Sequence, residues 1–268
     1  MDLDAGTENL IVYLKELESA VLALSGGLDS VFLMKALSMS GARALAVTGS
    51  TATTPPRDLV DAISYAEEFG VEHRVIDSGE TVRDDFLANP PDRCYHCKDS
   101  LFSRLAVIAE KEGYAMILDG GNLDDLDDHR PGRKAAREHG VLSPLAECGF
   151  AKKDIRAAAR KLGLDVAEKP ASPCLSSRFA YGVRITPEGL MRVSRAEDYI
   201  RDLLGIDELR VRDLGGRASI EVPSGNLKGL FAKRARIVER LKLLGFGAVD
   251  IDPEGFQSGK MNRALGDG

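Results

Sequence analysis

The sequence predicts an α/β fold with a parallel sheet flanked by helices, followed by a smaller C-terminal α+β domain. In the first half, short apolar runs alternate with stretches whose apolar residues recur at helical spacing, which is typical of βα units. Later, the order becomes helix, strand, strand, helix, strand. We therefore expect a first domain at 1–168, a linker at 169–186 and a small domain at 187–268.

The first domain should alternate strands and helices. Its first strand is the apolar run Ala20–Leu24, which ends at a glycine pair, and a helix over 30–39 follows. The same alternation continues with strands at 44–48, 72–76 and 115–118 and helices at 59–69, 98–111 and 152–162. In open parallel sheets, ligands bind beyond the carboxyl ends of the strands, so the loops that follow these strands are the expected site.

The small domain should contain two helices and three strands, with helices at 188–204 and 233–244 and strands at 208–213, 218–222 and 248–251. Between residues 120 and 149 the periodicity fades into a charged stretch with glycine and proline. Long irregular segments in compact domains are usually functional or mobile, so this stretch is a second candidate for the site.

Composition excludes several classes of protein. The 268 residues are 44% hydrophobic and 29% charged, as in ordinary globular proteins. No apolar run approaches the roughly 20 residues of a bilayer span, and the N-terminus has no signal-peptide pattern, so we expect a soluble, cytoplasmic protein without a membrane partner. The net charge of -6 disfavours a nucleic-acid partner. Four cysteines are too few for a disulfide scaffold and indicate metal ligands, redox groups or nucleophiles.

The sharpest motif is Ser25-Gly26-Gly27-Leu28-Asp29-Ser30, directly after the first strand. Glycines let the backbone approach a phosphate, the helix N-terminus supplies positive potential, and Ser25 and Ser30 add hydroxyl donors. The motif is neither a Walker loop nor the dinucleotide fingerprint. A plain Gly-Gly turn with a Ser or Asp helix cap is the alternative, but the spacing favours phosphate binding.

The cysteines allow three interpretations. Cys94 and Cys97 lie within one turn, and Cys174 is far away in the sequence. A structural zinc site could add Cys148 or His96, although such sites usually have two close ligand pairs. A redox Cys-x-x-Cys is possible, although its setting is not thioredoxin-like. The third interpretation is a [4Fe–4S] cluster on three thiolates, which leaves one iron open.

Ser25–Ser30 resembles the signature of the PP-loop ATP pyrophosphatases, which cleave ATP between the α and β phosphates and adenylate a carbonyl or carboxyl oxygen. Further stretches are similar to the LarE family, and together they cover nearly the whole chain: 119–125, 129–132, 143–145, 169–179, 209–212 and 252–256. The resemblance implies an ATP-dependent sulfur transferase. Such enzymes convert carboxylates of a pyridinium biscarboxylic acid mononucleotide to thiocarboxylates for the nickel-pincer nucleotide cofactor, forming AMP and pyrophosphate.

The resemblance also implies roles for matched residues. ATP, its pyrophosphate and Mg²⁺ would be bound by the loop and one later acidic residue, that is, by Ser25, Gly26, Gly27, Asp29, Ser30 and Asp124. Asp29 is the expected Mg²⁺ ligand, whereas helix capping is an equal alternative for Asp124. In the family, the cysteine matching Cys174 donates sulfur. Because Cys94 and Cys97 are also present, a [4Fe–4S] cluster on these three residues, carrying an extra sulfide, is favoured over conversion of Cys174 to dehydroalanine.

The small domain is expected to complete the substrate site. Arg210 and Arg212 alternate on a strand and so share a face, which suits a substrate phosphate as the resemblance implies, but a solvated basic face is an equal alternative. Glu197 matches a catalytic acid of the family, unless a slip of one residue places Asp198 there. Arg178 could steer an anion or form a structural ion pair.

Two further expectations concern the substrate and partners. The family commonly has Gly-Tyr-Arg near the C-terminus, where this chain has Gly255-Phe256-Gln257, so Lys260 or Arg263 would have to replace that arginine. The partners implied are a small-molecule nucleotide substrate, sulfide or another sulfur donor, and further copies of the chain in a homo-oligomer. A tRNA thiolase with the same loop is the alternative function, and the acidic balance counts against it.

Overall fold

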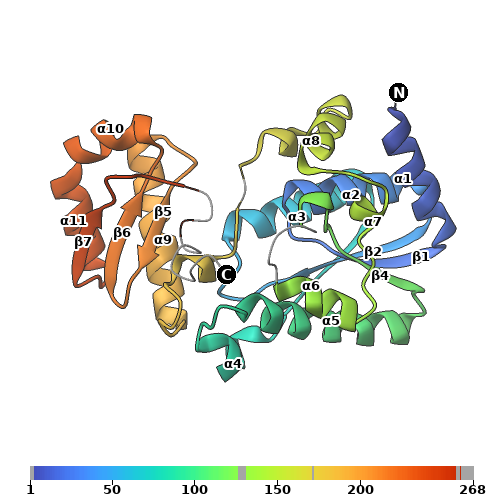
Figure 1. The fold of residues 1–268 in the computed structure, drawn as a ribbon, viewed down its shortest axis with the longest axis horizontal. Coiled ribbons are helices and arrows are strands. Elements are labelled where there is room, and N and C mark those ends of the chain that lie inside the picture. Colours follow the sequence, from blue (N-terminus) through green and yellow to red (C-terminus); the bar gives the residue numbers. More distant parts are fainter. Residues whose placement is uncertain (1–2, 126–130, 171, 258–259, 261–268) are drawn as a thin grey trace. The chain divides into compact units, whose positions relative to one another are not determined.

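The computed structural model describes residues 3–125, 131–170, 172–257 and 260, and the chain divides into two compact units (Figure 1). Unit 1 comprises Met1–Glu80 and Asp92–Ser172, and unit 2 comprises Thr81–Pro91 and Pro173–Gly268. The segment 81–91 belongs to unit 2 because the buried Asn89 amide donates to the carbonyl oxygens of Ala180 at 2.7 Å and Val183 at 3.1 Å. No feature of the sequence had indicated this excursion.

Unit 1 is built on a parallel sheet, which confirms the predicted fold class. The strands lie in the order β3-β2-β1-β4, and every pairing is parallel. Their bounds fall within about a residue of the predicted ones: β1 is Ser19–Ala23, β2 is Arg43–Gly49, β3 is Glu72–Ile76 and β4 is Met116–Leu118. The central strands are apolar because helices cover both faces of the sheet.

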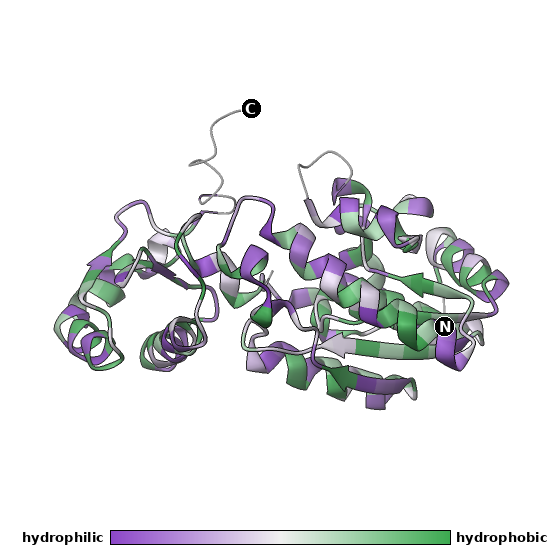
Figure 2. Cartoon of the chain, turned by 90° about the horizontal axis from the view of Figure 1, so that it is seen from below, coloured by the Kyte–Doolittle hydropathy of each residue, from purple (hydrophilic) through white to green (hydrophobic). Residues whose placement is uncertain are grey.

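Helices pack on both faces of this sheet (Figure 1). One face carries α1 (Ala5–Glu16), α2 (Leu28–Ser40), α3 (Pro56–Phe69), α7 (Pro144–Glu147) and α8 (Lys152–Lys161), and the other carries α5 (Arg93–Glu112) and α6 (Pro131–Glu138). Two apolar cores result, one around Phe32 and one around Phe102. In Figure 2 the strands of this sheet are coloured mainly as hydrophobic, whereas the surrounding helices mix both classes.

The start of α5 differs from the prediction. The helix begins at Arg93, not at residue 98, so Cys94 is its second residue and Cys97 its fifth. The first turn of this helix is polar, and it therefore lacks the apolar periodicity from which a helix is predicted. Helices α1, α6 and α7 were also missed; α6 buries only Ala135 and Ala136, too little apolar surface to mark a helical face.

Unit 2 has a small three-stranded sheet with helices. Strand β5 pairs antiparallel with β6, and β6 pairs parallel with β7. Its elements are α4 (Asp84–Leu87), α9 (Pro187–Leu204), β5 (Arg210–Asp213), β6 (Arg217–Glu221), α10 (Leu227–Ala232), α11 (Arg234–Leu243) and β7 (Ala248–Ile251). Thr186 caps α9 by accepting from the Gly189 amide at 3.1 Å. Of the helices described, none is long and apolar enough to cross a membrane.

Candidate active site: a glycine loop and a buried arginine cluster

The glycine loop of unit 1 connects β1 to α2 in a conformation that requires glycine. Gly26 has a φ of +74°, and a Cβ built there would lie 2.2 Å from the carbonyl oxygen of Asp58. The Ser25 amide donates to Ser30 Oγ at 3.1 Å, and the Ser30 hydroxyl lies 3.0 Å from that of Ser25. The loop therefore brings two hydroxyls and the N-terminus of α2 together, an arrangement suited to a phosphate.

Asp29, in the first turn of α2, carries a carboxylate that already has two partners. Lys152 Nζ lies 2.6 Å from both carboxylate oxygens, and Asn122 Nδ2 lies 3.2 Å from one of them. Burial raises the pKa of Asp29, and the Lys152 ammonium opposes that shift. Sequence reasoning missed both partners. Asn122 lies in the stretch 119–125 that resembles the family, and Lys152 is the first residue of α8, but no sequence signal connects either residue with Asp29.

The structure gives Asp124 a capping role. Its carboxylate accepts from the Lys152 amide at 2.9 Å, at the N-terminus of α8. This contact is the helix capping that sequence analysis held as an alternative, and ATP binding by Asp124 stays a prediction. Asp125 is buried, and its carboxylate accepts from the Asn122 amide at 3.0 Å. The two acidic residues thus shape the loop that presents Asn122 to Asp29.

The cysteine pair lies at the N-terminal end of α5, where Cys94 is exposed and Cys97 is half-buried. Residues three apart on a helix share a face, so the two side chains suit chelation. Helix α6 packs closely there, since a Cβ on Gly132 would lie 3.4 Å from the Cys94 carbonyl oxygen. Within the described residues, no group of three Cys, His, Asp or Glu side chains could hold a metal ion. Cys148 is half-buried, and burial raises its pKa.

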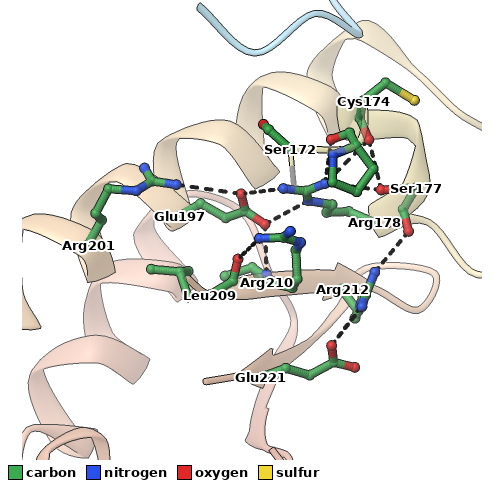
Figure 3. Close-up of polar contacts among 12 residues, drawn as sticks. Ser172, Cys174, Ser177, Arg178, Glu197, Arg201, Leu209, Arg210, Arg212 and Glu221 are labelled. Carbon is green, nitrogen blue, oxygen red and sulfur yellow. Dashed lines mark hydrogen bonds and ion pairs between the residues drawn. The ribbon is translucent and has the colours of Figure 1, made fainter. Parts of the chain in front are cut away.

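In unit 2, Arg178 and Glu197 form a buried bidentate ion pair (Figure 3). The Nε–Oε1 and Nη2–Oε2 distances are 2.8 and 3.0 Å, and the side chains are only 3% and 4% exposed. Glu197 also accepts from the Val211 amide at 3.0 Å, which ties α9 to β5. Asp198, the alternative acid, is 51% exposed and pairs with Arg201. The geometry therefore favours Glu197 over Asp198 as the acidic residue of this cluster. Of the two roles expected for Arg178, the structure shows the structural ion pair.

Arg210 and Arg212 extend the cluster along β5, and each is 6% exposed, so the solvated basic face is excluded. Arg212 Nη2 lies 2.7 Å from Glu221 Oε2, and Arg212 also donates to the Ser177 carbonyl oxygen (Figure 3). Burial, followed by the charges of Arg178 and Arg212, lowers the pKa of Arg210 to about 10. A bound anion would therefore stabilise the charged form of Arg210.

Cys174 caps the short 3₁₀ helix Leu175–Arg178 at the edge of the arginine cluster. Its carbonyl oxygen accepts from the Ser177 amide at 3.0 Å and from the Ser177 hydroxyl at 2.8 Å. Arg178 binds the neighbouring Pro173 carbonyl oxygen at 2.7 Å. The half-buried thiol points away from these guanidinium groups (Figure 3), so the backbone is fixed while the sulfur is directed elsewhere.

The C-terminal motif lies beside the same strands. Gly255 has a φ of +70°, and a Cβ there would lie 2.6 Å from the Val222 carbonyl oxygen. The Phe256 ring centroid is 4.9 Å from the guanidinium of Arg210. Lys260 Nζ pairs with Asp252 at 2.6 Å and Glu254 at 3.1 Å, and replacement of the family arginine by Lys260 stays a prediction. Arg263 lies outside the described residues.

A parallel sheet whose first strand runs through this glycine loop into a helix is the arrangement of the PP-loop fold, and the relatives that the chain matches are enzymes of that class. A pyridinium-3,5-bisthiocarboxylic acid mononucleotide synthase of Lactiplantibacillus plantarum is 38% identical over 258 residues, covering 96% of this chain and 93% of the relative. The chain belongs to that family, the LarE family of ATP-dependent sulfurtransferases, as the sequence motifs indicated.

Two other relatives match the chain to different extents. An uncharacterised protein of Synechocystis is 41% identical, over 98% of this chain and 99% of its own length. A tRNA-specific 2-thiouridylase of Acidithiobacillus ferrooxidans is 32% identical over 188 residues, covering 58% of this chain and 53% of the relative. No family model matches the chain. The similarity to the tRNA enzyme is thus partial, whereas the other two span nearly the whole chain.

Proposed function

We propose that this chain uses ATP to convert carboxylates of pyridinium-3,5-biscarboxylic acid mononucleotide to thiocarboxylates, for the nickel-pincer nucleotide cofactor. The observation that carries the proposal is the match, over nearly the whole length of both chains, to an enzyme named for the bisthiocarboxylic acid product. The glycine loop and the arginine cluster supply groups that such a reaction needs. A carboxylate resists attack by a sulfur nucleophile, so its oxygen must first be made a leaving group.

Activation would take place at the glycine loop. Ser25, Gly26, Gly27 and Ser30 would hold the pyrophosphate portion of ATP through backbone amides and hydroxyls. A substrate carboxylate oxygen would attack the α-phosphate, forming an acyl-adenylate while pyrophosphate leaves with the electron pair of the broken bond. Donors fixed before the reaction stabilise the charge that develops on the phosphates, which is usually the largest catalytic contribution.

Mg²⁺ fits the chemistry of the donors at Asp29. Carboxylate oxygen is a preferred ligand of this ion, and a bound cation would stabilise the ionised form of a carboxylate whose pKa burial raises. When bound with ATP, Mg²⁺ would neutralise charge on the phosphates. The Lys152 ammonium, 2.6 Å from Asp29, would keep the carboxylate charged and oriented in the absence of nucleotide.

Sulfur transfer would depend on Cys174, with Cys94 and Cys97 as further cluster ligands. The spacing of Cys94 and Cys97 at the start of α5 fits two of the three thiolates that a [4Fe–4S] cluster needs. A cluster held by the three would present one iron at which sulfide can bind. In the alternative, the Cys174 thiolate would attack the acyl carbon and AMP would leave. Loss of the Cα proton with cleavage of the Cβ–S bond would then leave dehydroalanine at Cys174 and the sulfur on the substrate as a thiocarboxylate.

Substrate binding is assigned to the arginine cluster. Arg210 and Arg212 would bind the phosphate of the mononucleotide. Their burial supports this, because a phosphate would offset the burial, and after it the repulsion from Arg178 and Arg212, that lower the pKa of Arg210. Glu197 would be the acidic residue of the substrate site beside them, where its carboxylate already accepts a hydrogen bond from Arg178. Unit 1, in place of the expected domain 1–168, would then form the adenylating domain, and unit 2, which includes Cys174, would complete the substrate site expected of 187–268.

Anaerobic reconstitution with iron and sulfide tests the sulfur source. We expect wild-type protein to bind a cluster and to form thiocarboxylate and pyrophosphate from ATP and substrate, whereas Cys94→Ala, Cys97→Ala and Cys174→Ala bind less iron. Cys148→Ala is the matched control and should bind iron normally. Normal cluster binding by all three variants would show that the cluster assignment is wrong, and dehydroalanine at Cys174 after turnover would establish the sacrificial route.

Two other expectations belong to this proposal. A tRNA thiolase is the second candidate, favoured only by the partial match to the 2-thiouridylase, and retention of tRNA on a filter at physiological salt would support it. The homo-oligomer expected from the family would be tested by light scattering of the purified chain.

A further inference from the structure

Lys169 connects two carboxylates to the backbone of the glycine loop. Its Nζ lies 2.8 Å from Asp58 Oδ1, 2.5 Å from Asp61 Oδ2 and 3.0 Å from the Gly26 carbonyl oxygen. The lysine side chain is 19% exposed and that of Asp58 is 8% exposed. Although burial alone would lower the pKa of Lys169, its hydrogen bonds to Asp58 and Asp61 raise it, so the ammonium is charged at neutral pH.

The contact with Gly26 fixes the direction of one loop peptide. All described peptide bonds are trans, and in a trans peptide the C=O and N–H bonds point in opposite directions. With the Gly26 carbonyl oxygen bound to Lys169, the Gly27 amide must point away from Lys169. There it donates to Ser25 Oγ at 3.3 Å, beside the hydroxyls that would receive a phosphate. Glycine at φ +74° has little intrinsic preference against a flipped peptide, so the contacts at the two ends of this peptide, Lys169 Nζ on the Gly26 carbonyl oxygen and Ser25 Oγ on the Gly27 amide, hold its orientation.

The backbone that carries Lys169 is itself held. Lys169 ends the 3₁₀ helix Asp165–Glu168, and its amide donates to the Val166 carbonyl oxygen at 3.1 Å. Pro170 restricts the residue before it to extended backbone. Three positions further along, the Ser172 hydroxyl donates to Asp58 Oδ2 at 2.9 Å, so Asp58 anchors the segment a second time. Lys169 therefore approaches the loop from a fixed origin.

We propose that Lys169 is a positioning residue for ATP: it holds the Gly26–Gly27 peptide with its N–H directed at the pyrophosphate. This inference rests on the proposed function, because it assumes that the loop binds pyrophosphate. Lys169 acts through the Gly26 carbonyl group and not by touching the nucleotide. Asp58 and Asp61 keep the ammonium charged and in place, and Asp61, with a side chain 38% exposed, is the less buried of the two.

Calorimetric titration of the full chain with magnesium pyrophosphate tests the inference. Lys169→Met keeps the aliphatic stem but removes the ammonium, and we expect a loss of affinity of about 10- to 100-fold, the scale of one lost hydrogen bond to a charged group. Lys169→Arg should recover part of the affinity because it restores a charged donor. Lys161→Met is the matched control, since Lys161 is 58% exposed and lies 3.6 Å from Asp4, and it should bind as wild type does.

Loss of the buried ammonium could also unfold unit 1, because Asp58 and Asp61 would face each other without a cation. Lys169→Met is therefore also made together with Asp61→Asn, which removes one of those charges, and compared with Asp61→Asn alone. We expect the double variant to bind pyrophosphate at least 10-fold more weakly than Asp61→Asn. In steady-state assays the KM for ATP should rise, whereas a merely structural lysine would lower the melting temperature and leave the KM of the folded enzyme unchanged.

Equal pyrophosphate affinity in Asp61→Asn and in the double variant would overturn this inference and leave the proposed function intact. If wild-type protein binds no pyrophosphate and releases none from ATP, the proposed function and the inference both fail. The two failures are thus separated by the wild-type titration.

Discussion

Replacement of Glu197 by glutamine should destabilise unit 2 far more than replacement of the adjacent Asp198 by asparagine. Glu197 is 4% exposed and accepts two hydrogen bonds from Arg178, which is 3% exposed. Removing one partner of a buried ion pair leaves an uncompensated charge and typically costs about 3–5 kcal/mol. Glutamine can still accept from the Val211 amide, so we expect about 3 kcal/mol for Glu197→Gln.

Asp198→Asn should cost only about 0–1 kcal/mol, because an exposed ion pair is screened by water. The two variants remove the same charge from neighbouring positions and differ mainly in burial. Urea unfolding followed by circular dichroism measures the global effect, and hydrogen exchange of peptides from α9 and β5 assigns it to unit 2. The double variant Arg178→Met with Glu197→Leu should lose less stability than the two single losses added together, by about 1–3 kcal/mol.

Equal losses in Glu197→Gln and Asp198→Asn would refute this reasoning. So would strict additivity in the double variant, because it would mean that Arg178 and Glu197 do not stabilise each other. A large loss for Asp198→Asn alone would instead show that the exposed acid, and not Glu197, is the one on which this cluster depends.

Two further predictions use other features of unit 1. Gly26→Ala should weaken pyrophosphate binding and lower stability, whereas Gly41→Ala, at a φ of +75° with nothing within 4 Å, should show only the strain of a left-handed residue, about 1–2 kcal/mol. Equal effects of Gly26→Ala and Gly41→Ala in melting and binding assays would mean that the close approach of Gly26 to the Asp58 carbonyl oxygen is unimportant. Burial lowers the pKa of His73 below 6.5, so the stability contributed by its neutral form is complete above pH 6.5 and is lost as the pH falls through the folded-state pKa. His73→Gln should flatten urea-derived stability between about pH 5 and pH 7, and an unchanged slope would contradict the assignment.

The sequence was most informative where periodicity and burial coincide. Strands β1 and β2 are apolar along their centres because helices cover both faces of the sheet, so their runs could be recognised directly. Helix α1 was not predicted, although its sequence carried a signal: Leu10 and Leu14 are one turn apart, and Asp4 caps the helix by accepting from the Thr7 amide. The first five residues of α5, which include the cysteine pair, gave no such signal.

Within the candidate site, the residues of a local motif could be predicted, but the distant residues that contact them could not. The glycine loop lies within six consecutive residues, and its turn, hydroxyls and helix start all follow from local rules. The lysines that hold it are distant in sequence: Lys152 is 123 residues from Asp29, and Lys169 is 143 residues from Gly26. A contact across such a separation depends on how β1, α3 and α8 pack, which residue types and spacing do not specify.

Asp124 shows how a motif residue can support a site through a contact within the protein. Its resemblance to the family implied ATP binding, yet its carboxylate accepts from the amide of Lys152. That contact fixes the first residue of α8, and the side chain of the same residue reaches the Asp29 carboxylate. Loss of the cap would therefore be expected to displace the ammonium that opposes the raised pKa of Asp29. The motif thus marks a residue that holds Lys152 in place, and the packing of α8 brings the Lys152 ammonium to the Asp29 carboxylate.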